Sequence, residues 1–159
     1  MGAAESTLPT WSFRSAASSD LRRLYDVWYA SVIATHDFLS QADLSDICLQ
    51  VKNEYLPNNP LLVAVDAQDR VIGFMGLSGR EIDSLFIDPS WRGKGLGRAF
   101  IEQASSGHPY IEVGVNAQNH QAIGFYEAVG FYAFTSSPTD DYGRPYPIVR
   151  MRLQLAHSE

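Results

Sequence analysis

The chain of 159 residues is poor in cysteine and in basic residues, and it has no long apolar run. Cys48 is its single cysteine, which excludes an internal disulfide framework and fits a reducing compartment, the cytoplasm. No apolar stretch reaches the length of about 18 residues that a membrane span needs, and the N-terminus lacks the pattern of a signal peptide. Lys and Arg number 12 against 18 Asp and Glu, and this acidic balance argues against a nucleic-acid binder.

The remaining composition is that of a folded domain. Apolar residues make up 45% of the sequence and charged residues 19%, proportions typical of a soluble globular protein. A chain of this length suits one domain with a sizeable core. We expect residues 1–10 to be a flexible leader and residues 11–159 to form a single domain.

Apolar spacing predicts a mixed sheet flanked by helices, in the α/β class. Alternating apolar residues with turn signals between them predict an antiparallel meander over residues 61–88. A strand–helix–strand crossover follows, and it implies one parallel pair of strands. Helical spacing predicts helices at 18–33, 44–55, 96–106 and 119–129. Strands are predicted at 11–14, 61–65, 70–78, 81–88, 110–115, 131–135 and 147–155.

The sequence WRGKGLG at 91–97 combines three glycines with cations and opens a predicted helix. The first backbone N–H groups of a helix have no partner, and the helix dipole adds positive potential there. Glycine lets a phosphate approach the backbone closely. Arg92, Lys94 and Arg98 supply positive charge in an acidic protein. The loop therefore predicts a diphosphate site, with a solvated tight turn as the alternative.

Two common nucleotide-binding patterns do not fit this loop. The P-loop pattern is absent because Lys94 lies between glycines and no Ser or Thr follows it. The dinucleotide pattern is also missed, because the glycines are at positions 93, 95 and 97. A dinucleotide fold further requires a run of parallel strand–helix units, and the predicted meander does not supply them.

Two motifs together resemble the GNAT superfamily of acyl-CoA-dependent N-acyltransferases. RGKGLG at 92–97 matches the first signature of the family, and NAQNHQAIGFYEAVGF at 116–131 is similar to the second. The order of elements matches from about residue 11 to 155, and THDFL at 35–39 resembles a subgroup of small bacterial acetyltransferases. The resemblance implies a mixed, mostly antiparallel sheet with a central splayed strand pair and flanking helices. It also implies direct acetyl transfer from acetyl-CoA to a primary amine.

The resemblance implies where acetyl-CoA binds. Backbone amides of the glycine loop would hold the pyrophosphate, and strand residues 85–87 would pair with the pantetheine arm. An asparagine of the second motif contacts CoA in this family, and a tyrosine lies near its sulfur. The expected acetyl-CoA residues are Leu85, Phe86, Ile87, Arg92, Gly93, Lys94, Gly95, Leu96, Gly97, Arg98, Asn116, Asn119 and Tyr126.

The chemistry requires a proton acceptor for the amine and an acid for the leaving thiolate. Tyr126 is the expected acid, although it also lies on the apolar stripe of its helix, where a core residue would be. Glu81 or Asp83 is the expected base, acting through a water. The two lie two residues apart on one predicted strand, so their side chains are expected on the same face of it. The alternative is that they belong to a solvent-exposed strand edge and have no catalytic role.

The acceptor pocket is expected to include His36, Phe38 and Tyr146. His36 either helps to deprotonate the amine or satisfies a helix terminus. The acceptor itself stays open between a small amine and a lysine or N-terminus of a protein. No histidine spacing predicts a metal site, and we expect a monomer or homodimer that binds no nucleic acid and no membrane. A catalytically silent CoA-binding sensor is the alternative function.

Overall fold

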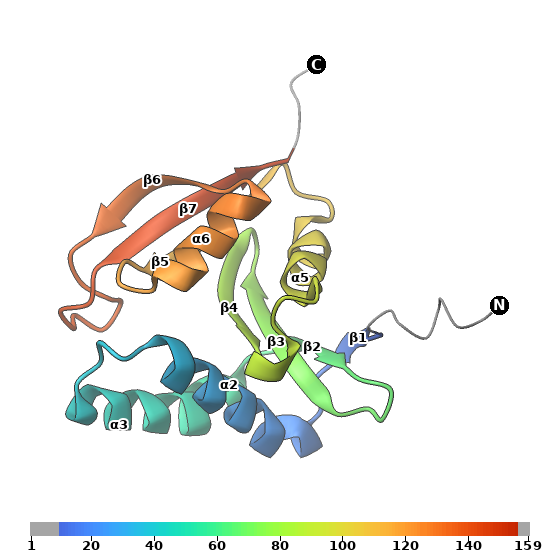
Figure 1. Ribbon diagram of the computed structural model, residues 1–159. Helices are drawn as coiled ribbons and strands as arrows, with labels where there is room; N and C mark the ends of the chain where they lie inside the picture. Colours follow the sequence, from blue (N-terminus) through green and yellow to red (C-terminus); the bar gives the residue numbers. More distant parts are fainter. Residues whose placement is uncertain (1–9, 156–159) are drawn as a thin grey trace.

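The computed structural model describes residues 10–155 and shows a sheet of seven strands with helices packed against it (Figure 1). Nearly all of the expected leader lies outside the described residues. The α-helices are α2 (Leu21–Thr35), α3 (Gln41–Gln50), α4 (Leu56–Asn58), α5 (Leu96–Ser105) and α6 (His120–Val129). Other helical turns are η1 (Ser18–Asp20), η3 (Pro89–Trp91) and the π-helical η2 (Val51–Tyr55). The strands are β1 (Ser12–Ser15), β2 (Leu61–Val65), β3 (Val71–Ser78), β4 (Glu81–Ile87), β5 (Tyr110–Asn116), β6 (Tyr132–Ser137) and β7 (Ile148–Gln154).

The strand order is β1-β2-β3-β4-β5-β7-β6, and β4–β5 is the parallel pair among antiparallel ones. This pair is short: Glu81 is opposite Glu112, Ile82 is opposite Val113, and the two strands then separate. β4 stays paired with β3, and β5 stays paired with β7. The predicted mixed sheet with a splayed central pair is therefore confirmed.

A β-bulge bends β4 at its N-terminal end. Gly76 of β3 is opposite Ser84, but the next residue, Leu77, is opposite Ile82, so Asp83 is an extra residue in β4. Bulges re-aim side chains and increase local twist. Here the bulge leaves Asp83 exposed between two buried neighbours, Ile82 and Ser84.

Two apolar cores cover the two faces of the sheet. One core joins α5 and α6 to the sheet and includes Phe100, Ile111 and Met151. The other joins α2 to β2 and β3 through residues such as Leu24 and Phe74. The second core draws no buried residue from β5, β6 or β7, and on that side Asn116 of β5 and Arg150 of β7 line a cavity.

Candidate active site

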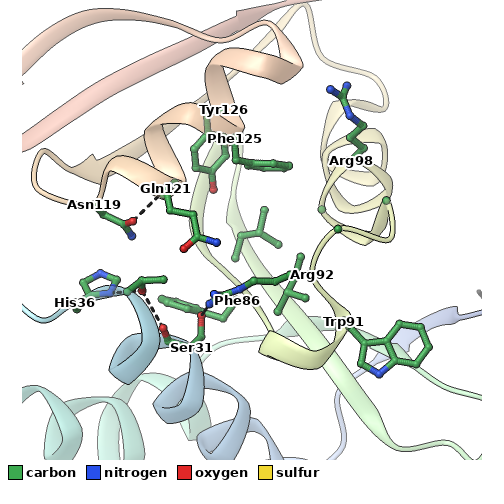
Figure 2. Close-up of a pocket in the computed structure, with 17 residues that line it drawn as sticks. Ser31, His36, Phe86, Trp91, Arg92, Arg98, Asn119, Gln121, Phe125 and Tyr126 are labelled. Atoms are coloured by element: carbon green, nitrogen blue, oxygen red, sulfur yellow. Dashed lines mark hydrogen bonds between the residues drawn. The ribbon is translucent and has the colours of Figure 1, made fainter.

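Two cavities lie on either side of β4 and share one lining residue, Phe86. The first has a volume of about 410 Å³ and lies between the glycine loop, α6, β4 and the end of α2 (Figure 2). The second has a volume of about 650 Å³ and lies between α3, η2, β4 and the loop that precedes β7. Two neighbouring cavities with different linings are suited to two different substrates.

The glycine loop forms one wall of the first cavity. Gly93 and Gly95 have φ angles of 75° and 90°, a conformation that glycine adopts readily, and Gly95 is the N-cap of α5. No side chain caps this helix, so its first N–H groups are available to an anion. Arg92 and Arg98 line the cavity, and the side chain of Arg92 also donates to Ser31 Oγ at 3.3 Å.

Two residues of the loop that were expected to bind acetyl-CoA do not line the first cavity. Lys94 does not line the cavity; its Nζ lies 5.8 Å from the ring centre of Trp91. Leu96 is only 1% exposed, lies in the core and does not line the cavity.

Residues Leu85, Phe86 and Ile87 of β4 form another wall of the first cavity. Because β5 pairs only with Glu81 and Ile82, the backbone of these three residues makes no sheet bond to β5. An exposed strand edge of this kind can pair with a chain of amides, as a peptide pairs with a sheet.

Tyr126 combines a packed ring with a free hydroxyl. Its side chain is 6% exposed, and its ring centre lies 5.1 Å from those of Phe125 and Phe131. The hydroxyl points into the first cavity (Figure 2) and has no hydrogen-bond partner among the described residues. Burial raises the pKa of the phenol far above its ordinary value, so the hydroxyl keeps its proton at neutral pH.

The two asparagines of the second motif lie in different cavities. Asn119 is the N-cap of α6, where its Oδ1 accepts a hydrogen bond from the Ala122 N–H at 3.1 Å, and it lines the first cavity. Asn116, at the end of β5, lines the second cavity and not the first. Its Oδ1 is buried and has no hydrogen-bond donor among the described residues.

The second cavity is rich in carboxylates. Those that line it are Glu54, Glu81, Asp83, Asp140 and Asp141, against the cations Arg144 and Arg150. Glu81 accepts from Arg150 at 2.8 Å, and Asp140 lies 3.5 Å from Arg144. Asp83 accepts from the Ser78 hydroxyl and has no basic partner within the described residues. The excess of negative charge suits a cationic ligand.

The expected acceptor residues are not brought together in one cavity. His36 lines the first cavity, and burial lowers its pKa, so the imidazole is neutral at pH 7. Phe38 packs between His36 and Tyr146 and lines neither cavity. The Tyr146 hydroxyl donates to Asp43 and accepts from the Ser40 N–H, and so it ties the loop before β7 to the start of α3.

Some lining residues were not expected from the sequence. In the first cavity these include Trp91, Gln121 and Phe125. Gln121 and Phe125 are four residues apart on α6 and so share a face of the helix beside Tyr126, a spacing from which they could have been predicted. In the second cavity Tyr55 and Glu54 come from the π-helical turn η2, which has no sequence signal of its own.

Within residues 10–155, no group of three or more His, Cys, Asp or Glu side chains is placed to hold a metal ion. In that same part of the chain, no helix is long and apolar enough to cross a membrane.

Comparison with known proteins gives consistent matches over most of the chain. The model of the acetyltransferase (GNAT) domain matches residues 37–155. The chain is 44% identical over 143 residues to the peptidyl-lysine N-acetyltransferase YjaB of Escherichia coli, spanning 88% of this chain and 95% of that protein. It is 41% identical over 140 residues to the protein of the same name from Salmonella typhimurium, spanning 88% of this chain and 96% of that protein.

A solved structure agrees with these matches. The solution structure of the apo form of YjaB from Escherichia coli superposes with a TM-score of 0.87 at 43% identity, covering 92% of this chain and 99% of that one. The family expected from the two motifs, and the N-acetyltransferase activity that goes with it, are confirmed. The chain belongs to the GNAT family of acetyltransferases.

Proposed function

We propose that this protein transfers the acetyl group of acetyl-CoA to the side-chain amine of a lysine in a protein. The observation that carries the proposal is the second cavity, whose carboxylates outnumber its cations and which shares the lining residue Phe86 with the first cavity. A lysine ammonium is attracted to such a cavity. The names of the relatives in Escherichia coli and Salmonella typhimurium point to the same class of acceptor.

In this proposal the first cavity holds acetyl-CoA. The N–H groups at Gly95 and the start of α5, with Arg92 and Arg98, bind the pyrophosphate. The free edge of β4 at 85–87 pairs with the amides of the pantetheine arm. Asn119 lies on the same wall as Tyr126 and orients the end of that arm. The fit is supported by the donor set, which offers uncapped N–H groups and cations on one wall and a strand edge on another.

Tyr126 is the proposed acid. As the amine nitrogen bonds to the thioester carbonyl carbon and the C–S bond breaks, the phenol gives its proton to the departing sulfur. The raised pKa keeps the hydroxyl protonated before this step. The absence of a hydrogen-bond partner among the described residues leaves the hydroxyl free to donate to a ligand.

Asp83 is the proposed base, acting on the amine through a water. It lies exposed on the bulge of β4, lines the second cavity and bonds to a neutral hydroxyl rather than to a cation. Glu81 lines the same cavity but is paired with Arg150, so we assign it to fixing that arginine. The single cysteine supports action in a reducing compartment such as the cytoplasm.

Release of CoA from acetyl-CoA, followed by mass spectrometry of the acceptor, tests the proposal. A lysine-containing peptide with a blocked N-terminus should gain one acetyl group on lysine, while the same peptide with lysine replaced by norleucine should not react. A peptide with a free N-terminus and no lysine, together with a polyamine, tests the other acceptor classes. Tight acetyl-CoA binding without turnover on any amine would instead support the sensor function.

A further inference from the structure

We propose that Asn116 binds the acceptor amine, through its carboxamide oxygen, rather than acetyl-CoA. The inference rests on the proposed function, because it assigns the second cavity to the acceptor. It concerns the residue that positions the nitrogen for attack, and it separates the roles of two asparagines that stand three residues apart in one motif.

The position of Asn116 follows from the alternation of β5. Ile111, Val113 and Val115 are buried, so the residues between them face the other side of the sheet. On that side, Gly114 and Asn116 line the second cavity together with Asp83 of β4. Asn119 follows after the strand has ended and turns into the first cavity as the N-cap of α6.

The backbone of Asn116 is held firmly while its side chain is not. The carbonyl accepts from the Asn119 N–H at 2.9 Å, and the residue is opposite Ile148 in the β5–β7 ladder. The carboxamide makes no hydrogen bond to any described residue, and its oxygen is buried. Leaving a buried polar group unpaired is costly, so a donor from a ligand stabilises it. Because the carboxamide has no hydrogen bond to break, we expect it to turn its oxygen toward the cavity when an amine binds.

The chemistry of the amine favours a neutral partner. The ammonium is attracted by the carboxylates of the cavity, but it must lose a proton before the nitrogen can attack. A carboxylate in direct contact would favour the charged form, whereas an amide oxygen accepts an N–H from both the charged and the neutral amine. Asn116 therefore holds the nitrogen through deprotonation, while Asp83 in the same cavity takes the proton through water.

Asn116→Leu tests the assignment, because leucine has a similar size but cannot accept a hydrogen bond. We expect the KM for a lysine peptide to rise about tenfold, with the Kd of acetyl-CoA unchanged by calorimetry. Asn116→Asp keeps an acceptor oxygen and adds charge. It should restore most of the affinity and move the rise of kcat with pH to higher pH, because the bound amine now favours its charged form. If Asn116 had only a structural role, the two variants would not differ in this way in the KM for the peptide while the Kd of acetyl-CoA stays constant.

Two outcomes would overturn the inference. A weaker Kd for acetyl-CoA with an unchanged KM for the peptide would make Asn116 a donor-site residue. If the Kd of acetyl-CoA and the KM for the peptide are both unchanged in a folded Asn116→Leu protein, Asn116 binds neither substrate.

A titration with n-butylamine tests the inference without turnover. In the wild-type protein the side-chain NH₂ resonances of Asn116 should shift by NMR, and those of Asn119 should not. If lysine peptides are not acetylated but this shift occurs, the proposed function fails and the amine site stands. If peptides are acetylated and no shift occurs, the proposed function stands and the assignment of Asn116 to the amine fails.

Discussion

The Glu81 carboxylate lies 2.8 Å from the Arg150 guanidinium, although β5 runs between their two strands. Gly114 of β5 is opposite Arg150 in the ladder, and Arg150 Nη1 lies 3.5 Å from the position that a Cβ of Gly114 would take. The arginine therefore passes over a residue without a side chain to reach Glu81. The hydrogen bond to Glu81 raises the pKa of Arg150. Glu81 is thus held by a cation, which distinguishes it from Asp83.

This difference predicts unequal effects at the two carboxylates. Asp83→Asn should lower kcat about 10²-fold, because a general base is usually worth that much or more. Glu81→Gln keeps a hydrogen bond to Arg150 and should lower kcat only a few fold. Steady-state rates with saturating acetyl-CoA measure both, and an equal or larger loss at Glu81 would reverse the assignment.

Gly95→Ala tests the glycine loop as an anion site. The added Cβ would lie 3.9 Å from the Trp11 ring, and its strain would fall on the loop that presents the first N–H groups of α5, so we expect the Kd of acetyl-CoA to rise at least about tenfold. Gly107→Ala is the matched control, because its φ of 79° is close to the 90° of Gly95 and nothing lies within 4 Å of the added Cβ. Both variants carry a similar backbone strain of roughly 1–2 kcal/mol. Equal changes in Kd by calorimetry would mean that strain alone is responsible.

The cations of the loop should contribute unequally to binding. Arg92→Gln removes a guanidinium that lines the first cavity and should raise the Kd of acetyl-CoA about tenfold. Lys94→Gln removes a cation near Trp91 that lines no part of that cavity, so it serves as the control and should have an effect of about threefold or less. Binding should also weaken with salt, and less so in Arg92→Gln. An equal loss of affinity for acetyl-CoA in the two variants would show that only the net charge of the loop matters.

The elements of the fold were predictable because their signals are local. Apolar spacing and glycine punctuation placed each predicted strand within two residues of its observed ends, from β2 at 61–65 to β7. The bulge at Asp83 and the π-helical turn η2 were not predictable, since both arise from packing between distant segments. Glu81 and Asp83 both line the second cavity, but the bulge at Asp83 interrupts the alternation from which a shared face was predicted, and no pattern gave a sign of Arg150.

The site was predictable where a motif fixes the backbone and less so where a loop must fold back. The glycine loop, the free edge of β4 and Tyr126 meet in one cavity, as expected. Asn116 lies in the other cavity because the end of β5 decides which way its side chain faces. Tyr146 was expected in the acceptor pocket, but its hydroxyl reaches Asp43 on α3, a contact across 103 positions in sequence that no local pattern encodes.

His36 should make the protein less stable in mild acid. Burial lowers its pKa in the folded protein below the 6.5 of an exposed histidine, so the unfolded chain binds a proton first as the pH falls. The free energy of unfolding therefore falls as the pH drops below about 6.5, the pKa of the histidine in the unfolded chain. His36→Asn should flatten the fall in the free energy of unfolding between about pH 7 and 5, measured with urea. His120→Asn, which replaces an exposed histidine, is the control for the substitution itself.

Tyr126→Phe separates the chemical role of the phenol from its packing. The ring keeps its contacts with Phe125 and Phe131, and the hydroxyl has no partner to lose among the described residues, so the melting temperature should not fall. The Kd of acetyl-CoA should also change little. If the hydroxyl protonates the leaving sulfur, kcat should fall about 10²-fold or more. Tyr132→Phe, which alters an exposed tyrosine of β6, is the matched control and should keep the wild-type rate.

The pH profile adds a second readout for Tyr126. An acid must be protonated to act, and burial raises the pKa of this phenol above its ordinary value of 10.0. Its loss of the proton therefore lies above the working range, and any fall in rate below about pH 10 belongs to another group. Tyr126→Phe should thus lower the whole profile without moving its limbs. Single-turnover measurements exclude masking by product release, and a folded Tyr126→Phe protein with wild-type single-turnover rates would leave Tyr126 as a core residue beside the donor site.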